Sequence, residues 1–145
     1  MSEVEDFLSP AEEQAIVQAI ALAEKNTSGE IRVHIENHSE TPPIARAQEV
    51  FNFLKMYQTE ARNGVLFYVG VTDKTFAIIG DIGIDDVVET DFWDSTKDLV
   101  IEKFKEKKHK EGLVNGIIRA GERLKTFFPY ESDDINELSN EISKG

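Results

Sequence analysis

Apolar residues recur along the chain with two spacings, one typical of helices and one typical of strands. The segment Ser9-Pro10-Ala11-Glu12 has the form of a capping box with proline at the first helical position, and it predicts the start of a helix. Its apolar face runs through Ile16, Val17, Ile20 and Ala21. Strict alternation over 30–36 then predicts a strand with one buried face, near a sheet edge.

Later segments continue both patterns. A second helix has a buried stripe of Ala47, Val50, Phe51 and Leu54, and it ends before Asn63-Gly64. The uninterrupted apolar run 65–69 favours a central strand covered on both faces. A tight turn at 72–74 then returns the chain as an antiparallel strand over 75–79. We expect a third helix from about Thr90, a break at Gly112, and a fourth helix that ends before Pro129.

This order of elements predicts an α/β fold, a mixed sheet of about four strands sandwiched between helices. A right-handed crossover makes the first two strands parallel. Residues 1–130 form the predicted domain. Residues 131–145 form an acidic C-terminal tail, in which a short helix through Ile135, Leu138 and Ile142 would be marginal on its own.

Composition excludes several classes of protein. The 145 residues suit one domain, and the absence of cysteine excludes disulfides and thiolate chemistry. A net charge of −12 argues against binding to nucleic acid or anionic lipid. No apolar stretch approaches the ~20 residues of a membrane span, and the acidic N-terminus does not resemble a signal peptide. We therefore expect a cytoplasmic monomer.

No sequence motif of a known catalytic template is present. The chain has neither a Gly-x-Ser-x-Gly elbow nor a phosphate-binding Gly-x-x-x-x-Gly-Lys loop. The three histidines, His34, His38 and His109, are scattered, and we interpret them as solvated side chains, with His34 on the outward face of its strand. The lysine-rich run 103–110 is interpreted as a solvated helix end.

Carboxylates are the remaining candidates, because Ca²⁺ and Mg²⁺ prefer oxygen ligands. Ligands in open α/β sheets favour the crevice beyond the carboxyl ends of parallel strands. Those ends carry Glu36 and Asp73, next to the loop 38–41, whereas Asp81 falls at the opposite end of the sheet. The alternative is structural: Asp73 would make a hairpin turn and Asp81 would cap or turn its loop.

Several segments together resemble the TPM domain family. They are Leu8-Ser-Pro-Ala-Glu-Glu13, Thr27-Ser-Gly-Glu-Ile-Arg-Val33, Arg62-Asn-Gly-Val-Leu-Phe-Tyr-Val69, Asp73-Lys74, Ala77-Ile-Ile-Gly-Asp-x-Gly-Ile84, Phe92-Trp93 and Phe127-Phe-Pro129. These blocks occur in order over nearly the whole chain. In this respect the chain resembles the short soluble bacterial members of the family.

The resemblance implies a sheet of about four strands and a divalent cation bound at an acidic patch in loops. Asp73 matches the family's recurrent aspartate after the central strand, and Asp81 matches the aspartate of the Gly-Asp-x-Gly-Ile block. Asp85 stands where many short members carry histidine. A plant thylakoid relative has been assigned acid phosphatase activity.

Our leading hypothesis is a protein that binds Ca²⁺ or Mg²⁺ weakly, with a dissociation constant on the order of 10⁻⁴ M or above. The expected ligands are Asp73 foremost, then Glu36 and Asp81. Two alternatives stay open. One is a metal-dependent acid phosphatase-like enzyme with aspartate as nucleophile or base. The other is an adaptor whose acidic tail or helix faces bind a protein partner.

Overall fold

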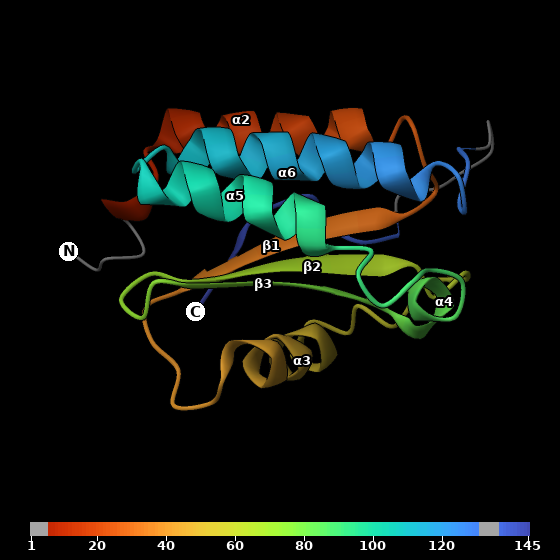
Figure 1. The fold of residues 1–145 in the computed structure, drawn as a ribbon, viewed down its shortest axis with the longest axis horizontal. Helices are drawn as coiled ribbons and strands as arrows, with labels where there is room; N and C mark the ends of the chain where they lie inside the picture. The colour runs from red at the N-terminus through yellow and green to blue at the C-terminus, as the bar shows by residue number, and fades with distance from the viewer. Residues whose placement is uncertain (1–5, 131–136) are drawn as a thin grey trace.

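A computed structural model of the protein describes residues 6–130 and 137–145. Three helices cover one face of a sheet and a single helix covers the other (Figure 1). The helices are α2 (Pro10–Ala23), α3 (Pro43–Phe53), α4 (Ile82–Asp85), α5 (Asp94–Lys105) and α6 (His109–Leu124). The strands are β1 (Glu30–Glu36), β2 (Gly64–Gly70), β3 (Thr75–Gly80) and β4 (Ser143–Lys144). The predicted α/β fold is confirmed.

The sheet is mixed, in the order β3-β2-β1-β4. β1 and β2 are parallel, with Glu36 opposite Gly70 at their carboxyl ends, and β3 returns antiparallel to β2. α3 connects the two parallel strands and covers a face of the sheet, and the loop before α3 lies beside the carboxyl ends. This topology is the predicted one, with β4 added parallel to β1.

The sheet separates two hydrophobic clusters. The larger joins one face of β1, β2 and β3 to α2, α5 and α6, and includes Ile31, Val33, Phe67 and Leu113. The smaller lies under α3 and includes Leu66 and Tyr68 of β2 with Val50 and Phe51 of α3. Alternate residues of β2 therefore enter different clusters, and every residue of that strand is buried, as its unbroken apolar run predicts.

The boundary between α5 and α6 differs from the prediction. Gly112 lies inside α6, and the break comes earlier, at Lys107, which takes a positive φ of 61°. A Cβ on Gly112 would lie 3.0 Å from Lys103 Cβ and 3.1 Å from the Val100 carbonyl oxygen of α5. This glycine allows the two helices to approach closely and does not end a helix. α5 also begins at Asp94, four residues after the predicted Thr90.

The C-terminal segment packs against the domain. Of the predicted tail helix, Ile135 falls outside the described residues, and residues 137–145 contain no helix. Ser143 and Lys144 pair with β1 instead, and the Lys144 amino group lies 2.8 Å from a Glu13 carboxylate oxygen of α2. Leu138 joins the cluster under α3. Pairing with β1 supplies the backbone hydrogen bonds that an isolated short helix could not secure.

No helix in the described parts of the chain is both long and apolar enough to cross a membrane.

Candidate functional site at the carboxyl end of the sheet

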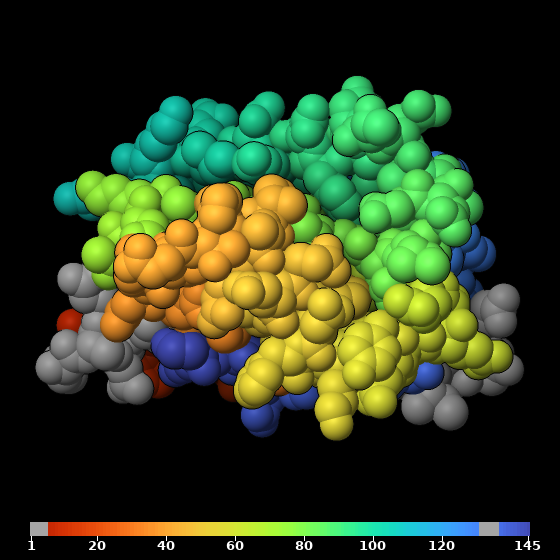
Figure 2. All heavy atoms as spheres, turned by 90° about the horizontal axis from the view of Figure 1, so that it is seen from below, coloured from red at the N-terminus to blue at the C-terminus, as the bar shows by residue number. Residues whose placement is uncertain are grey.

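The turn between β2 and β3 holds Asp73 against the loop that follows β1. Asp73 Oδ2 accepts a hydrogen bond from the Ser39 main-chain N–H (2.9 Å), and its Oδ1 lies 2.6 Å from His38 Nδ1. The other ring nitrogen of His38 lies 2.9 Å from Glu40 Oε1. One imidazole thus bridges two carboxylates beyond the carboxyl ends of the parallel strands. Figure 2 shows this loop, in orange, next to the yellow-green β2–β3 turn.

Charge explains why the bridge forms. Hydrogen bonds to Asp73 and Glu40 raise the pKa of His38 to about 9, so the ring is protonated at neutral pH and donates from both nitrogens. The same contact with His38, together with the Ser39 N–H, lowers the pKa of Asp73. The His38 side chain is 53% exposed and that of Glu40 is 95% exposed. The bridge is therefore open to solvent and to ions.

Beneath this bridge, Glu36 is the centre of a buried network. Its Oε1 accepts from Arg46 Nη2 (2.9 Å) and lies 3.0 Å from His34 Nε2. Its Oε2 accepts from Arg46 Nε (2.8 Å) and from the Tyr68 hydroxyl (2.6 Å). Burial alone would raise the pKa of Glu36, but these hydrogen bonds outweigh it and lower the pKa to about 2. Both oxygens of Glu36 are occupied.

His34 is buried, which corrects the prediction of a solvated side chain on an outward face. It is 5% exposed, and its Nδ1 lies 2.9 Å from the Ser143 hydroxyl of β4. Burial lowers the pKa of His34. The alternation in β1 places His34 on the face away from the main core, as predicted, but β4 and the side chains around Glu36 cover that face.

Asp81 lies at the opposite end of the sheet, as its position in the sequence predicts. It forms a two-pronged ion pair with Arg62, with distances of 2.7 Å from Nε to Oδ2 and 2.9 Å from Nη2 to Oδ1. Its Oδ1 also accepts from the Ile82 N–H and caps α4. The structural alternative for Asp81 accounts for this geometry, and Asp81 does not meet Asp73 or Glu36.

The donor set determines what the carboxyl end could bind. Within the described residues, no group of three or more His, Asp or Glu side chains is arranged to hold a metal ion as it stands. The His38 bridge does offer two carboxylates that already share one positive charge. In the same loop, the side-chain oxygen of Asn37 is buried and has no hydrogen-bond partner among the described atoms. Such an oxygen suits a hard cation or its bound water.

The sequence pointed to Asp73 and Glu36 but not to their partners, His38 for Asp73 and Arg46 and Tyr68 for Glu36. Nothing in the spacing of His38 or Arg46 signals these contacts, because both residues lie on the crossover between the parallel strands. The apolar run 65–69 predicts that Tyr68 is buried in a strand but indicates no polar role for it. A signal was available there, since a tyrosine buried in a central strand usually requires a hydrogen-bond partner for its hydroxyl.

The sheet order, the helices on both of its faces and the acidic loop at the carboxyl ends define the class, a small α/β domain with a polar site at one rim. The chain belongs to the TPM domain family, whose pattern matches residues 2–123. It is similar to the BA42 protein from the psychrophilic bacterium Bizionia argentinensis, known from an NMR structure, at 56% identity over the full length of both chains and a TM-score of 0.93.

More distant structures share the fold alone. The N-terminal domain of a Porphyromonas gingivalis protein is 15% identical, with 86% of this chain and 82% of that chain covered and a TM-score of 0.69. The N-terminal domain of the cg2496 protein from Corynebacterium glutamicum is 9% identical, with 95% and 81% covered and a TM-score of 0.63. Comparison with curated proteins gave no match.

Proposed function

We propose that this TPM domain binds a divalent cation, Ca²⁺ or Mg²⁺, at the rim formed by the β2–β3 turn and the loop after β1. Asp73 is the principal ligand, and Glu40 is the second carboxylate. The observation that carries the proposal is the His38 bridge, in which one imidazolium holds both carboxylates together. A cation would replace the positive charge of the ring, and the Ser39 N–H would keep Asp73 in place.

The proposed site leaves out two of the three predicted ligands. Glu36 could reach a metal only by giving up hydrogen bonds from Arg46 and Tyr68, and Asp81 only by giving up Arg62. Leaving a buried partner without its hydrogen bond costs about 1–3 kcal/mol. With two carboxylates and water as ligands, binding is weak, with a dissociation constant on the order of 10⁻⁴ M or above.

The test is a titration of the protein with Ca²⁺ and then Mg²⁺ at constant ionic strength, followed by amide NMR. Shifts are expected at Ser39, Glu40 and Asp73. Asp73→Asn should weaken binding at least tenfold, and His38→Ala should tighten it severalfold because it frees Asp73 Oδ1. Asp86→Asn, the same charge change at an exposed residue of the opposite end, is the matched control and should bind as the wild type does.

Two results would contradict the proposal. One is an Asp73→Asn protein that binds as tightly as the wild type, and the other is a set of shifts centred on Arg62 and Asp81. The metal-dependent phosphatase and adaptor hypotheses stay predictions. Phosphate chemistry would require a free cation beside Asp73, but Arg46 is committed to Glu36 and Glu49, and Lys74 lines the cavity on the other side of the turn.

A further inference from the structure

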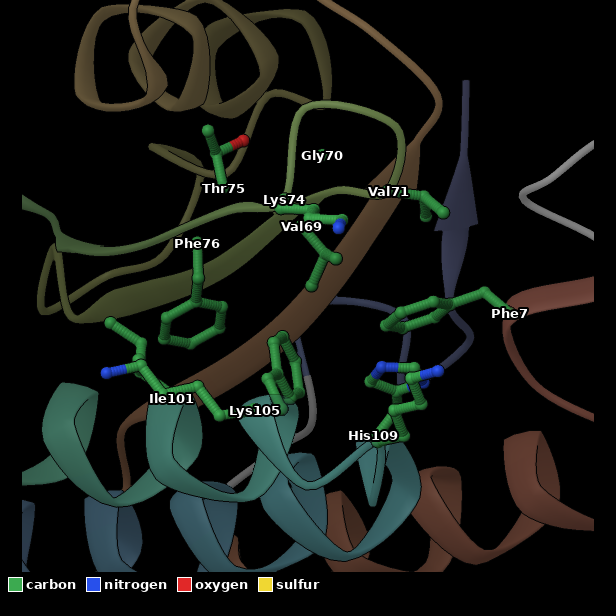
Figure 3. Close-up of a pocket in the computed structure, with 12 residues that line it drawn as sticks. Phe7, Val69, Gly70, Val71, Lys74, Thr75, Phe76, Ile101, Lys105 and His109 are labelled. Atoms are coloured by element: carbon green, nitrogen blue, oxygen red, sulfur yellow. The ribbon is translucent and has the colours of Figure 1, made fainter.

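A cavity of about 580 Å³ lies beside the β2–β3 turn, on the side away from the proposed cation site. It opens between the β2–β3 hairpin, the end of α5, the first residue of α6 and Phe7 (Figure 3). Its volume falls within the range of small-molecule pockets, which run from about 300 to 1,000 Å³. None of the predicted or proposed cation ligands lines it.

The floor of the cavity is apolar. Val69 and Phe76 rise from the sheet, and Ile101 faces them from α5. Phe104 of α5 meets Phe76 edge to face, with ring centroids 5.6 Å apart. Phe7 stacks on His109, with ring centroids 4.2 Å apart, and closes one side. Burial lowers the pKa of His109, so this ring adds little positive charge at neutral pH. The floor therefore suits a hydrocarbon body.

The remaining polar lining is mostly cationic. Lys74 comes from the hairpin, and Lys105 and Lys107 come from the end of α5. Within the described chain, no carboxylate oxygen lies within 4.0 Å of any of their amino groups. Three unpaired lysines around one apolar cavity contrast with the net charge of −12 of the whole chain. α6 also begins at His109 without a side-chain cap, which adds the positive end of its dipole.

Two of these lysines have an unusual backbone. Lys74 and Lys107 take positive φ values of 54° and 61°, a region that favours glycine and that side chains such as lysine rarely adopt. Glycine would adopt the backbone conformation of either position more easily than lysine does. Lys74 lies in the hairpin turn and Lys107 lies between α5 and α6, so glycine can replace both side chains without straining the backbone.

We propose that this cavity binds a small amphipathic anion, a hydrocarbon body with one carboxylate. The body lies on Val69, Phe76, Ile101 and Phe104, and the carboxylate meets Lys74, Lys105 and Lys107 at the opening. The proposal is independent of the cation site, because it uses other side chains on the opposite face of the sheet.

Decanoate, below its micelle concentration and in the presence of a chelator, is the probe, and 1-decanol and acetate are the comparison ligands. NMR titration should show shifts for decanoate at Val69, Phe76 and Ile101. Decanol should bind at least fivefold more weakly and acetate not measurably, because the charge and the chain are both needed. Keeping metal out of the sample separates this test from that of the cation site.

The variants exploit the backbone conformation. Replacing Lys74 and Lys107 together by glycine removes two charges at positions where glycine is favoured, so the melting temperature should stay within a few degrees of that of the wild type. Decanoate affinity should fall at least fivefold while decanol affinity stays unchanged. Lys55→Gly is the matched control, since Lys55 has a φ of 56° and does not line the cavity.

Three outcomes would overturn the proposal. They are equal affinities of the wild type for decanoate and decanol, unchanged decanoate affinity in the double glycine variant, and shifts outside the cavity.

Discussion

At the scale of single residues, the buried carboxylate of Glu36 holds the side chains around it together. Among the described residues at this rim, it has the most hydrogen-bonding partners. Four hydrogen-bonding contacts from three side chains satisfy both of its oxygens. The three partners come from β1, β2 and α3, so this one side chain connects the crossover helix to both parallel strands. The network supports the rim and is not itself the exposed site.

Removal of this carboxylate should therefore destabilise the protein. Glu36→Ala leaves the Tyr68 hydroxyl buried without a partner and leaves the Arg46 guanidinium with only its exposed partner, Glu49. We expect a loss of about 3 kcal/mol in the free energy of unfolding, measured by urea denaturation. Glu49→Ala, which removes the exposed partner of Arg46, serves as the control and should change stability by less than about 1 kcal/mol. Equal stability of Glu36→Ala and the wild type would show that the network has no structural role.

At the scale of elements, the packing of α5 against α6 depends on Gly112 and Gly116, and the sequence alone assigns Gly112 to the wrong role. Glycine is a poor helix former, so the sequence predicts a helix break at Gly112. The packing of two helices against each other is a tertiary property, and no local pattern shows which face of α6 approaches α5. The strands β1, β2 and β3 and their directions were predictable, since the alternation over 30–36, the apolar run 65–69 and the turn at 72–74 are local signals.

Gly116 gives a sharp test of this packing. A Cβ there would lie 2.4 Å from Val100 Cγ2 of α5 and 3.2 Å from Phe67 Cε2 of β2. Gly116→Ala should gain about 1 kcal/mol in helix propensity yet lose more through overpacking, so a net destabilisation of about 1–2 kcal/mol is expected. Thermal denaturation would measure it. Glu122→Ala, at an exposed position of the same helix, should be neutral within about 0.5 kcal/mol, and a stabilised Gly116→Ala protein would refute the close approach.

At the scale of the whole molecule, the C-terminal segment joins parts that are distant in sequence. It pairs with β1, contacts α2 through Lys144, and donates the Leu138 N–H to Glu30 Oε1. The sequence predicted neither β4 nor these contacts, because two residues of strand carry no periodic signal. The candidate site, too, was only partly predictable from the sequence. Position at a strand end predicted Asp73, but the bridge through His38 depends on how the crossover loop folds back.

Two carboxyls beside this segment predict how stability depends on pH. Burial raises the pKa values of Glu24 and Glu30 to about 7. Between the ordinary value of 4.5 and 7 the folded protein holds protons that the unfolded chain releases, so stability is fully present below pH 4.5 and is lost as the pH rises through 7.

Glu30→Gln should remove part of this dependence. The amide oxygen can still accept from Leu138, and no proton is lost at higher pH. We expect the difference in melting temperature between pH 5.5 and pH 8 to shift toward greater stability at pH 8 in this variant, by several degrees. Comparison with wild type cancels the opposing contribution of the histidines whose pKa is lowered, and Glu122→Gln is the control. An unchanged pH profile for Glu30→Gln would show that Glu30 ionises normally.

The β2–β3 turn places consecutive residues on opposite faces of the sheet, with Asp73 at the cation rim and Lys74 at the apolar cavity. One peptide bond would thus join the two proposed binding surfaces. Linkage requires that any factor by which calcium changes the affinity for a fatty acid equals the factor by which the fatty acid changes the affinity for calcium. A turn of this kind would let the domain report on two chemically unrelated solutes at once, with no hinge and no second subunit.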